Sequence, residues 1–504
     1  MVAQVRSATL SGIDALEVVV EVDTVKSFQP YFQLVGLPDK AVQESQHRIR
    51  SAMRNSEMEF PRGTVVCNLA PADIRKEGPL LDLPIAISIL AATHQVPLSA
   101  LETTVLVGEL GLDGMLRPVD GALSVALMAR AMGFKRLVVP AENGPEASVA
   151  DGVAVYGLKK LSEVAELLNG SLLFQPLVPD ATGLHRLPNY AIDYADVKGQ
   201  RHGIRALEIA AAGGHNLLFT GPPGSGKTML ARRLPTILPP LELDEAIEVT
   251  KIHSAAGERR GQQGLVWERP CRTPHHTASY AAVVGGGKIP KPGEVSLAHN
   301  GVLFLDEMPE FDRDVLEALR QPLEDGVVTV ARVQSTVTFP AECIVIGAMN
   351  PCPCGYKGYP EAQCVGAGPC ARYAGKISGP LLDRIDLSVT IPRLKPDELS
   401  RSPDGEPSAI IQKRVIDARR MQRERYKASR VNASLTPREL GQFVALDEES
   451  TAFMKMVSTR LNLSARVYDR MLKVARTIAD LGGCERVSKG HLAEAVQYRT
   501  HESN

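Results

Sequence analysis

The segment LLFTGPPGSGKTML, Leu217 to Leu230, leads from an apolar strand through a glycine-rich loop into a helix, which predicts a phosphate-binding loop in an α/β domain. The glycines allow tight turns that point backbone N–H groups at an anion, and the helix start adds its positive end. We expect Lys227 to reach the β- and γ-phosphates of a nucleoside triphosphate and the Thr228 hydroxyl to bind Mg²⁺. The predicted nucleotide-binding loop comprises Gly221, Pro222, Pro223, Gly224, Ser225, Gly226, Lys227 and Thr228.

A second apolar strand ends in two carboxylates within GVLFLDE, Gly301 to Glu307. Ligands of open α/β sheets bind at the carboxyl ends of the strands, so these side chains should lie at the nucleotide. We expect Asp306 to hold Mg²⁺ and Glu307 to act as general base toward the attacking water. A further buried strand, Ile344 to Met349, ends at Asn350, whose amide can hydrogen-bond the γ-phosphate.

The composition indicates a globular protein of about three domains. The 504 residues carry a formal net charge of −1, with 44% hydrophobic and 23% charged residues. This balance argues against a globally basic nucleic-acid-binding protein but is compatible with a local basic channel. Polar residues interrupt the N-terminal segment, which does not resemble a signal peptide, and the longest apolar run, Leu83 to Ala92, is too short to span a bilayer. We therefore expect a cytoplasmic protein without membrane contact.

Half of the eight cysteines are crowded into one segment rich in Pro and Gly, at Cys352, Cys354, Cys364 and Cys370. Four thiolates at such spacing can form a tetrahedral Zn²⁺ site. Free thiols or a disulfide are the alternatives, of which the disulfide suits a cytosolic protein least. His275 and His276 have no paired ligands at metal spacing, so we expect them at the active site or at the base of the loop that follows them.

Sequence patterns divide the chain into four regions. Residues 1–170 alternate strands and helices, and residues 171–190 contain three prolines and predict a linker. Residues 191–395 form the predicted P-loop α/β domain, and residues 396–504 a helical lid. In the lid, Ile410 to Lys427 predicts a strongly basic helix, which is either a DNA-binding surface or a solvent-exposed face.

Two elements of the P-loop domain follow from periodicity. Asp312 to Leu323 predicts one amphipathic helix, with its leucines and Val315 on one face. Val327 to Val330 and Ser335 to Phe339 alternate apolar and polar residues, which predicts a β-hairpin.

Two stretches of the first region resemble the proteolytic domain of Lon: Pro71 to Ile89, with KEGPLLDLPIA, and Gly114 to Asn143. The resemblance places the Lon nucleophile on Leu80 and the Lon base on Leu123. Leucine can neither attack a carbonyl nor accept a proton. We therefore expect a Lon-protease-like domain of the ribosomal S5 domain 2-like class, without peptidase activity.

The segments CRTPHHTASYAAVVGGGKIPKPGEVSLAHNGVLFLDE (271–307), EDGVVTVARVQSTVTFPAECIVIGAMNPCPCG (324–355) and ISGPLLDRIDL (377–387) resemble the Mg-chelatase-related group of AAA+ ATPases. Together with the inactive Lon-like domain, they resemble the ComM/YifB family of bacterial competence proteins over nearly the whole chain. The expected fold is therefore α/β, with an N-terminal Lon-like domain, a central AAA+ P-loop domain and a C-terminal helical lid.

The resemblance implies a hexameric, ATP- and Mg²⁺-dependent DNA helicase that promotes branch migration during natural transformation, with recombination proteins as possible partners. It also implies roles for single residues: Val197 near the adenine, Asn350 as sensor 1, Arg384 as the arginine finger of a neighbouring subunit and Arg466 as sensor 2. An ordinary surface ion pair of Arg384 and a solvated charge at Arg466 are the alternatives.

The resemblance places two elements at a central pore: an insert near Gly285 to Pro292 and a pre-sensor-1 hairpin near Val327 to Phe339. Their basic residues Lys288, Lys291 and Arg332 would contact DNA phosphates without distinguishing bases. Each is equally compatible with a solvated surface charge. The alternative function is a chelatase-like or unfoldase-like motor that remodels a protein partner.

Overall fold

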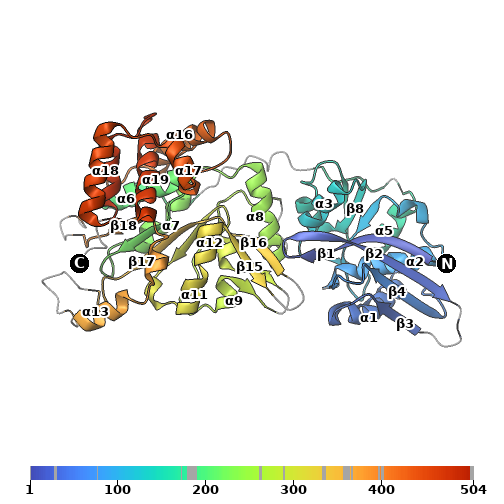
Figure 1. Cartoon of the computed structure of the whole chain (residues 1–504). Helices are drawn as coiled ribbons and strands as arrows, with labels where there is room; N and C mark the ends of the chain where they lie inside the picture. Colours follow the sequence, from blue (N-terminus) through green and yellow to red (C-terminus); the bar gives the residue numbers. More distant parts are fainter. Residues whose placement is uncertain are drawn as a thin grey trace. The chain divides into compact units, whose positions relative to one another are not determined.

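Two sheets organise the chain, one of seven strands in the N-terminal part and one of five strands around the phosphate loop. The structure, a computed structural model, describes residues 2–25, 27, 31–76, 78–171, 173–178, 190–259, 264–287, 290–331, 336–355, 364, 367–394, 398 and 402–499. The chain divides into two compact units (Figure 1). The first comprises Met1–Arg186 and Glu242–Val266, and the second Leu187–Leu241 and Trp267–Asn504.

The sheet of the first unit has the order β3-β4-β2-β1-β5-β8-β9 and mixes antiparallel and parallel pairs. Its strands are β1 (Val2–Ser11), β2 (Asp14–Val25), β3 (Tyr31–Val35), β4 (Thr64–Ala70), β5 (Thr104–Leu106), β8 (Arg136–Pro140) and β9 (Ala154–Leu158). Buried and exposed residues alternate along β4, as expected for a strand with one face on the core. A small hairpin, β6 (Glu109–Leu110) with β7 (Leu116–Arg117), completes the strands of this unit.

Helix α2 (Asp82–Ala92) is the centre of this unit, because all of its residues are buried. It packs on β1 and β2 and against α1 (Lys40–Asn55). Its first residue, Asp82, is a buried carboxylate that accepts two hydrogen bonds from Arg48, at 2.7 and 2.9 Å. The remaining helices of Met1–Arg186 are α3 (Ala122–Ala131), α4 (Gly144–Ala147) and α5 (Leu161–Leu168).

Helix α8 (Leu243–Ala256) comes from the middle of the chain but belongs to this first unit. It packs on α3, where the buried Ser254 hydroxyl accepts the Gly121 N–H at 3.0 Å and lies 3.2 Å from the Glu146 carboxylate. Lys251 adds an ion pair to Asp14 at 2.7 Å. The sequence of a helix does not indicate the unit on which it packs. The return of the chain to the first unit was therefore not predicted.

The sheet of the second unit is entirely parallel, with the order β11-β14-β17-β10-β18. Its strands are β11 (Cys271–Arg272), β14 (Val302–Leu305), β17 (Ile344–Met349), β10 (Leu217–Thr220) and β18 (Leu387–Thr390). The apolar runs around Leu217, Val302 and Ile344 thus form the predicted buried strands. Because these three strands are parallel, their carboxyl ends lie at one edge of the sheet. The phosphate loop, Asp306 and Asn350 directly follow these ends.

One helix precedes the first strand of this sheet, and further helices lie between its strands in the chain. They are α6 (Arg201–Gly213), α7 (Lys227–Arg232), α9 (Tyr280–Val283), α10 (Glu294–Leu297), α11 (Arg313–Ala318), α12 (Arg320–Asp325), α13 (Ala367–Ala374) and α14 (Gly379–Leu382). The prediction of one helix over Asp312 to Leu323 was wrong, since α11 and α12 are separate. Pro322 explains the break, because proline lacks an N–H and clashes with the carbonyl four residues earlier. The expected hairpin forms from β15 (Val327–Ala331) and β16 (Thr336–Pro340).

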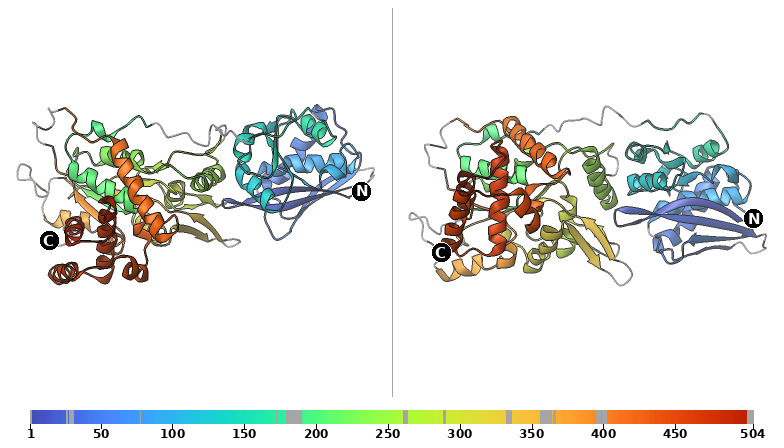
Figure 2. Two further views of the ribbon diagram at one scale, coloured as in Figure 1. Left: turned by 90° about the horizontal axis from the view of Figure 1, so that it is seen from above. Right: turned by 45° about the horizontal axis from the view of Figure 1, so that its top comes forward.

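The C-terminal region is helical and lies against the second sheet, as Figure 1 and Figure 2 show. Its helices are α16 (Ser408–Tyr426), α17 (Pro437–Phe443), α18 (Glu448–Leu461), α19 (Ala465–Leu481) and α20 (Lys489–Gln497). Apolar residues of α16, α18, α19 and α20 share one hydrophobic core with β10, β17 and β18. Among the helices of the described residues, none is long and apolar enough to cross a bilayer.

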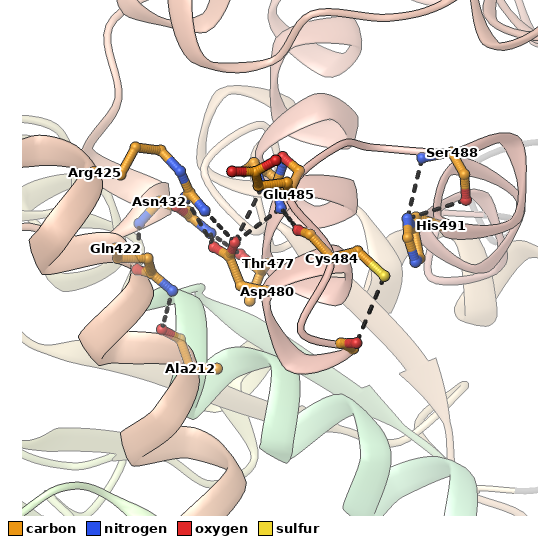
Figure 3. Close-up of polar contacts among 12 residues, drawn as sticks. Ala212, Gln422, Arg425, Asn432, Thr477, Asp480, Cys484, Glu485, Ser488 and His491 are labelled. Atoms are coloured by element: carbon orange, nitrogen blue, oxygen red, sulfur yellow. Dashed lines mark hydrogen bonds and ion pairs between the residues drawn. The ribbon is translucent and has the colours of Figure 1, made fainter.

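A buried polar network joins α16 and α19 (Figure 3). Its centre is Asp480, whose side chain is fully buried and accepts hydrogen bonds from Arg476 at 2.9 Å and Asn432 at 2.9 Å. Arg425 of α16 also donates to Asp480, at 3.1 Å. The Asn432 amide continues to Thr477 at 2.9 Å. Satisfied buried networks of this kind fix the arrangement of the helices that contribute to them.

We expect Asp480→Ala to lower the free energy of unfolding by about 3–5 kcal/mol, because it leaves the buried Arg476 and the half-buried Arg425 without their carboxylate. The matched control is Asp417→Ala, which removes the exposed pair to Arg420 on α16 and should cost ~0–1 kcal/mol. Guanidinium-induced unfolding followed by circular dichroism compares the two variants. Equal shifts in their transition midpoints would contradict this assignment of the network.

Candidate nucleotide-binding site

The predicted phosphate loop connects the end of β10 to the start of α7, as the sequence indicated. Gly224 and Gly226 have positive φ angles of 73° and 92°, a conformation that favours glycine. A Cβ atom at Gly221 would lie 2.3 Å from the carbonyl oxygen of Ile391, so the loop packs directly on the segment after β18. Glycine at these positions therefore allows both the turn and the close packing.

Lys227 lies at the first position of α7 and its ammonium group is enclosed by the loop. The Nζ atom donates to the carbonyl oxygens of Gly221 at 2.7 Å and Pro222 at 3.0 Å, and to Oδ1 of Asn350 at 3.2 Å. Burial lowers the pKa of Lys227, and the negative charges of Asp306 and Glu307 oppose this shift. All three acceptors are uncharged, so an anionic phosphate would be a stronger partner for this cation.

The Thr228 hydroxyl donates to Oδ2 of Asp306 at 2.7 Å, which brings together the two side chains predicted to bind Mg²⁺. A hydroxyl and a carboxylate are the hard oxygen ligands that Mg²⁺ prefers, so the donor set fits this ion. Beside them lies a cavity of about 410 Å³. Its lining includes most of the phosphate loop together with Asp306, Glu307 and Asn350. The residues present therefore fit a nucleotide with its metal ion.

Glu307 projects from the edge of the sheet after β14, with a positive φ angle of 50°. Its Oε2 atom lies 3.6 Å from Nδ1 of His276, whose ring is 4.2 Å from that of His275. The two histidines follow β11, the strand next to β14, which explains how they reach Glu307. The contact between His276 and Glu307 agrees with the expectation of these histidines at the active site.

The segment before α6 that includes Val197 contacts the phosphate loop through Gln200. Val197 is fully buried in the hydrophobic core, and among the described residues that line the cavity it does not appear. Gln200 instead donates from Nε2 to the Ser225 carbonyl at 3.3 Å and to the Pro392 carbonyl at 2.8 Å. The assignment of Val197 to the adenine stays a prediction.

Arg384 lies at the opposite edge of the sheet from the nucleotide site. It precedes β18, whereas the phosphate loop, Asp306 and Asn350 all follow strands that run parallel to β18. A strand of this length separates the two edges by roughly 13 Å. The guanidinium group pairs with Glu324 and donates to the Pro380 carbonyl. The structure therefore does not bring Arg384 to the nucleotide site of its own chain.

Arg466 is exposed near the start of α19. Hydrogen bonding to Arg384 lowers the pKa of Glu324, and the positive charge of Arg466 also lowers it. Arg384 and Arg466 thus act on one carboxylate, although they are far apart in the sequence. Their predicted catalytic roles are not tested by the single chain.

The predicted DNA contacts can be placed only in part. Lys291 is exposed in β13 (Lys291–Pro292), which pairs with β12 (Gly285–Gly286), whereas Lys288 and Arg332 lie outside the described residues. The basic helix α16 uses several arginines within the unit: Arg414 pairs with Glu208 and Glu406, and Arg419 donates to the Ala211 carbonyl. These contacts favour a structural role for that face of α16.

The four clustered cysteines lie close together in space. Their Sγ atoms are 3.1 Å apart for Cys352 and Cys354, 3.7 Å for Cys354 and Cys364, 3.9 Å for Cys364 and Cys352, and 3.3 Å for Cys364 and Cys370. No disulfide joins these described thiols. In a tetrahedral Zn²⁺ site, Zn–S bonds of about 2.3 Å place the sulfur atoms ~3.8 Å apart. Cys352, Cys364 and Cys370 could hold one metal ion, since their Sγ atoms all lie within 4.8 Å of one another, and Cys354 contacts two of these three thiols.

Three family models match separate parts of the chain, and full-length relatives match nearly all of it. Residues 193–399 match the model for magnesium chelatase, subunit ChlI, residues 20–143 that for subunit ChlI of Mg-chelatase, and residues 405–499 that for the ChlI C-terminal region. The competence protein ComM of Haemophilus influenzae is 44% identical over 99% of this chain and 97% of its own. The uncharacterized protein YifB of Salmonella typhimurium is also 44% identical, over the same shares.

The chain belongs to the ComM/YifB family. The expectation of this family is thereby confirmed, together with a Mg-chelatase-like AAA+ ATPase domain and a C-terminal helical region. AAA+ ATPases of this kind bind ATP and Mg²⁺, in agreement with the loop and the oxygen ligands described above.

Two further relatives match short parts of this ComM/YifB-family chain. Lon protease 2 of Bacillus subtilis is 28% identical over 97 residues, or 19% of this chain and 17% of its own. The DNA repair protein RadA of Escherichia coli is 32% identical over 88 residues, or 18% of each. These local similarities do not determine the fold of the N-terminal unit or the substrate of the motor.

Proposed function

We propose that the chain is an ATP-hydrolysing motor that acts on DNA as a ring of subunits, each nucleotide being held between two neighbours. The main support for this proposal is the position of Arg384 at the edge of the sheet opposite the nucleotide site. An AAA+ site needs a positive charge at the γ-phosphate beyond that of its own loop, and such an arginine contributes about 10³–10⁵-fold to the rate. Arg384 lies at the far edge of its own sheet, so a neighbouring subunit is the site that it can serve.

Within one chain, the remaining roles follow from the geometry. Lys227 would exchange its carbonyl partners for phosphate oxygens, and Thr228 and Asp306 would hold Mg²⁺, which neutralises charge on the phosphates. Glu307 would accept a proton from the attacking water, and Asn350 would orient that water. Arg466 would add a second positive charge at the neighbour's nucleotide.

DNA is the substrate that the relatives favour. One full-length relative is called a competence protein and a local relative a DNA repair protein, so we propose a role in competence that involves DNA. The insert that contains Lys291, and the β15–β16 hairpin, would contact the phosphate backbone in the pore of a hexamer, with Lys288 and Arg332 as further contacts. Helicase action and branch migration are the activities proposed for such a motor, together with recombination proteins as partners.

The match to magnesium chelatase supports a second candidate, a motor that remodels a protein partner. Under either function, we propose a Lon-like N-terminal unit without peptidase activity. Leu80 and Leu123, at the positions that resemble the Lon nucleophile and base, are both buried in apolar surroundings, with exposed fractions of 5% and 0%. This unit would serve assembly or partner contact.

ATP turnover distinguishes the two candidates when it is measured without DNA, with single-stranded DNA and with a three-stranded branched substrate. We expect branched DNA to stimulate turnover severalfold, and Lys227→Ala and Arg384→Ala each to lower turnover by about 10³-fold or more and to abolish strand displacement. Lys489→Ala, which removes only the exposed pair to Glu449, is the matched control and should behave as wild type. Turnover that depends on Lys227 but not on DNA would instead favour the protein-remodelling motor.

We further propose that Cys352, Cys364 and Cys370, whose Sγ atoms all lie within 4.8 Å of one another, bind one Zn²⁺ together with Cys354. The ion would close the segment that follows Asn350 and so stabilise the chain beside the nucleotide site. Elemental analysis should find about one zinc per chain in the wild-type protein and much less in Cys370→Ser. Cys484→Ser, outside the cluster, should keep the metal. A zinc-free wild-type protein with reactive thiols at these positions would refute the site.

A further inference from the structure

The main chain of Arg384 accepts a hydrogen bond from a half-buried amide. Asn216, which directly precedes β10, donates from Nδ2 to the Arg384 carbonyl at 3.1 Å and accepts the Val345 N–H of β17 at 2.9 Å through Oδ1. The Asn216 carbonyl also accepts the N–H groups of Asp386 and Leu387, each at 3.0 Å. These bonds connect the starts of three parallel strands and tie the backbone of Arg384 to the sheet.

The side chain of Arg384 is turned back onto its own chain. The Arg384 side chain is only 11% exposed, because it pairs with Glu324 and donates from Nη1 to the Pro380 carbonyl at 2.6 Å. The Nε atom is buried and has no hydrogen-bond partner among the described residues. A guanidinium group held in this way is not presented to a phosphate of another subunit. The Glu324 carboxylate is the charged group that holds it there.

Glu324 lies next to the proposed DNA-contacting hairpin. It occupies α12, which ends at Asp325, and Gly326 then leads directly into β15. The Gly326 carbonyl accepts the Ala341 N–H just after β16 at 2.8 Å, and Gln321 of α12 donates to Thr329 of β15 at 3.3 Å. Helix α12 and both strands of the hairpin are therefore joined at their base. A displacement of the hairpin would move Glu324 with it.

We propose that Glu324 is a positioning residue that restrains Arg384 until the hairpin engages DNA. The inference rests on the proposed function, since it requires that Arg384 acts on the nucleotide of a neighbouring subunit. Glu324 competes with the neighbour's γ-phosphate for one guanidinium group. Movement of α12 with the hairpin withdraws the carboxylate, and Arg384 turns toward the phosphate. DNA binding is thereby coupled to hydrolysis through a single exchange of ion-pair partners.

The ion pair between Arg384 and Glu324 is weak enough to be exchanged for a contact with phosphate. Glu324 is 54% exposed, and a pair with one exposed partner is weak because water screens the attraction. Hydrogen bonding to Arg384 lowers the pKa of Glu324, so the carboxylate stays ionised at neutral pH. The neighbour's phosphate carries more charge than one carboxylate and competes effectively once the geometry allows it. The restraint is therefore partial, and its removal should change the rate by a modest factor.

Mixed rings test this inference. Lys227→Ala subunits lack a working loop but keep Arg384, whereas Arg384→Ala subunits have the opposite defect, so a mixture should hydrolyse ATP where neither protein does alone. Adding Glu324→Gln to the Lys227→Ala subunits should raise the DNA-free rate of the mixture about two- to fivefold and leave the DNA-stimulated rate unchanged. Glu449→Gln, which neutralises an exposed glutamate paired with Lys489, is the matched control and should change neither rate.

The outcomes distinguish the restraint by Glu324 from the shared nucleotide site on which it rests. Restored activity in the mixture with no increase from Glu324→Gln would overturn the restraint while leaving the shared site intact. A mixture without activity would overturn the shared site and, with it, the restraint. In the single chain, Glu324→Gln combined with Arg384→Ala should show no increase in DNA-free turnover. An increase there would show that Glu324 acts through another group and would also overturn the restraint.

Discussion

The parallel direction of β14, β17, β10 and β18 is the constraint on which the site depends. Because all of these strands run the same way, every residue that follows a strand lies at one edge of the sheet and every residue that precedes one lies at the other. The phosphate loop, Asp306 and Asn350 belong to the first group, and Arg384 belongs to the second. Under the proposed function, the first edge binds the nucleotide of its own chain, and Arg384 at the second edge would complete the site of a neighbouring chain.

The elements of this site could be predicted from the sequence because their signals are local. A strand, a glycine-rich turn and a helix start are encoded in consecutive residues around Lys227, and an apolar run that ends in two carboxylates identifies Asp306 and Glu307 in the same way. The parallel sheet then brings these segments together, with Thr228 bonded to Asp306 and Lys227 to Asn350. The prediction of one helix over Asp312 to Leu323 was wrong because it considered only the apolar periodicity. Pro322, which interrupts the helix, is also a local signal.

The contacts that were not predicted join residues far apart in the chain. Gln200 supports the phosphate loop, Asn216 holds the carbonyl of Arg384, and Glu324 pairs with its guanidinium group. No spacing rule links such residues, because their proximity depends on the order of the strands. Helix α8 shows the same effect on a larger scale, since its sequence is typical of many helices but it packs within the N-terminal unit. Polar residues beside predicted strand ends are the best available signal for contacts of this kind.

The most direct test of the shared site is an electron cryomicroscopy structure of the assembled Glu307→Gln protein with ATP and Mg²⁺. Removal of the proposed base should retain the nucleotide, so that the partners of its γ-phosphate can be measured. We predict that the Arg384 guanidinium group of one subunit lies within hydrogen-bonding distance, about 3 Å, of the γ-phosphate held by its neighbour. An assembled ring in which each γ-phosphate contacts only its own subunit, with Arg384 still paired to Glu324, would contradict the account.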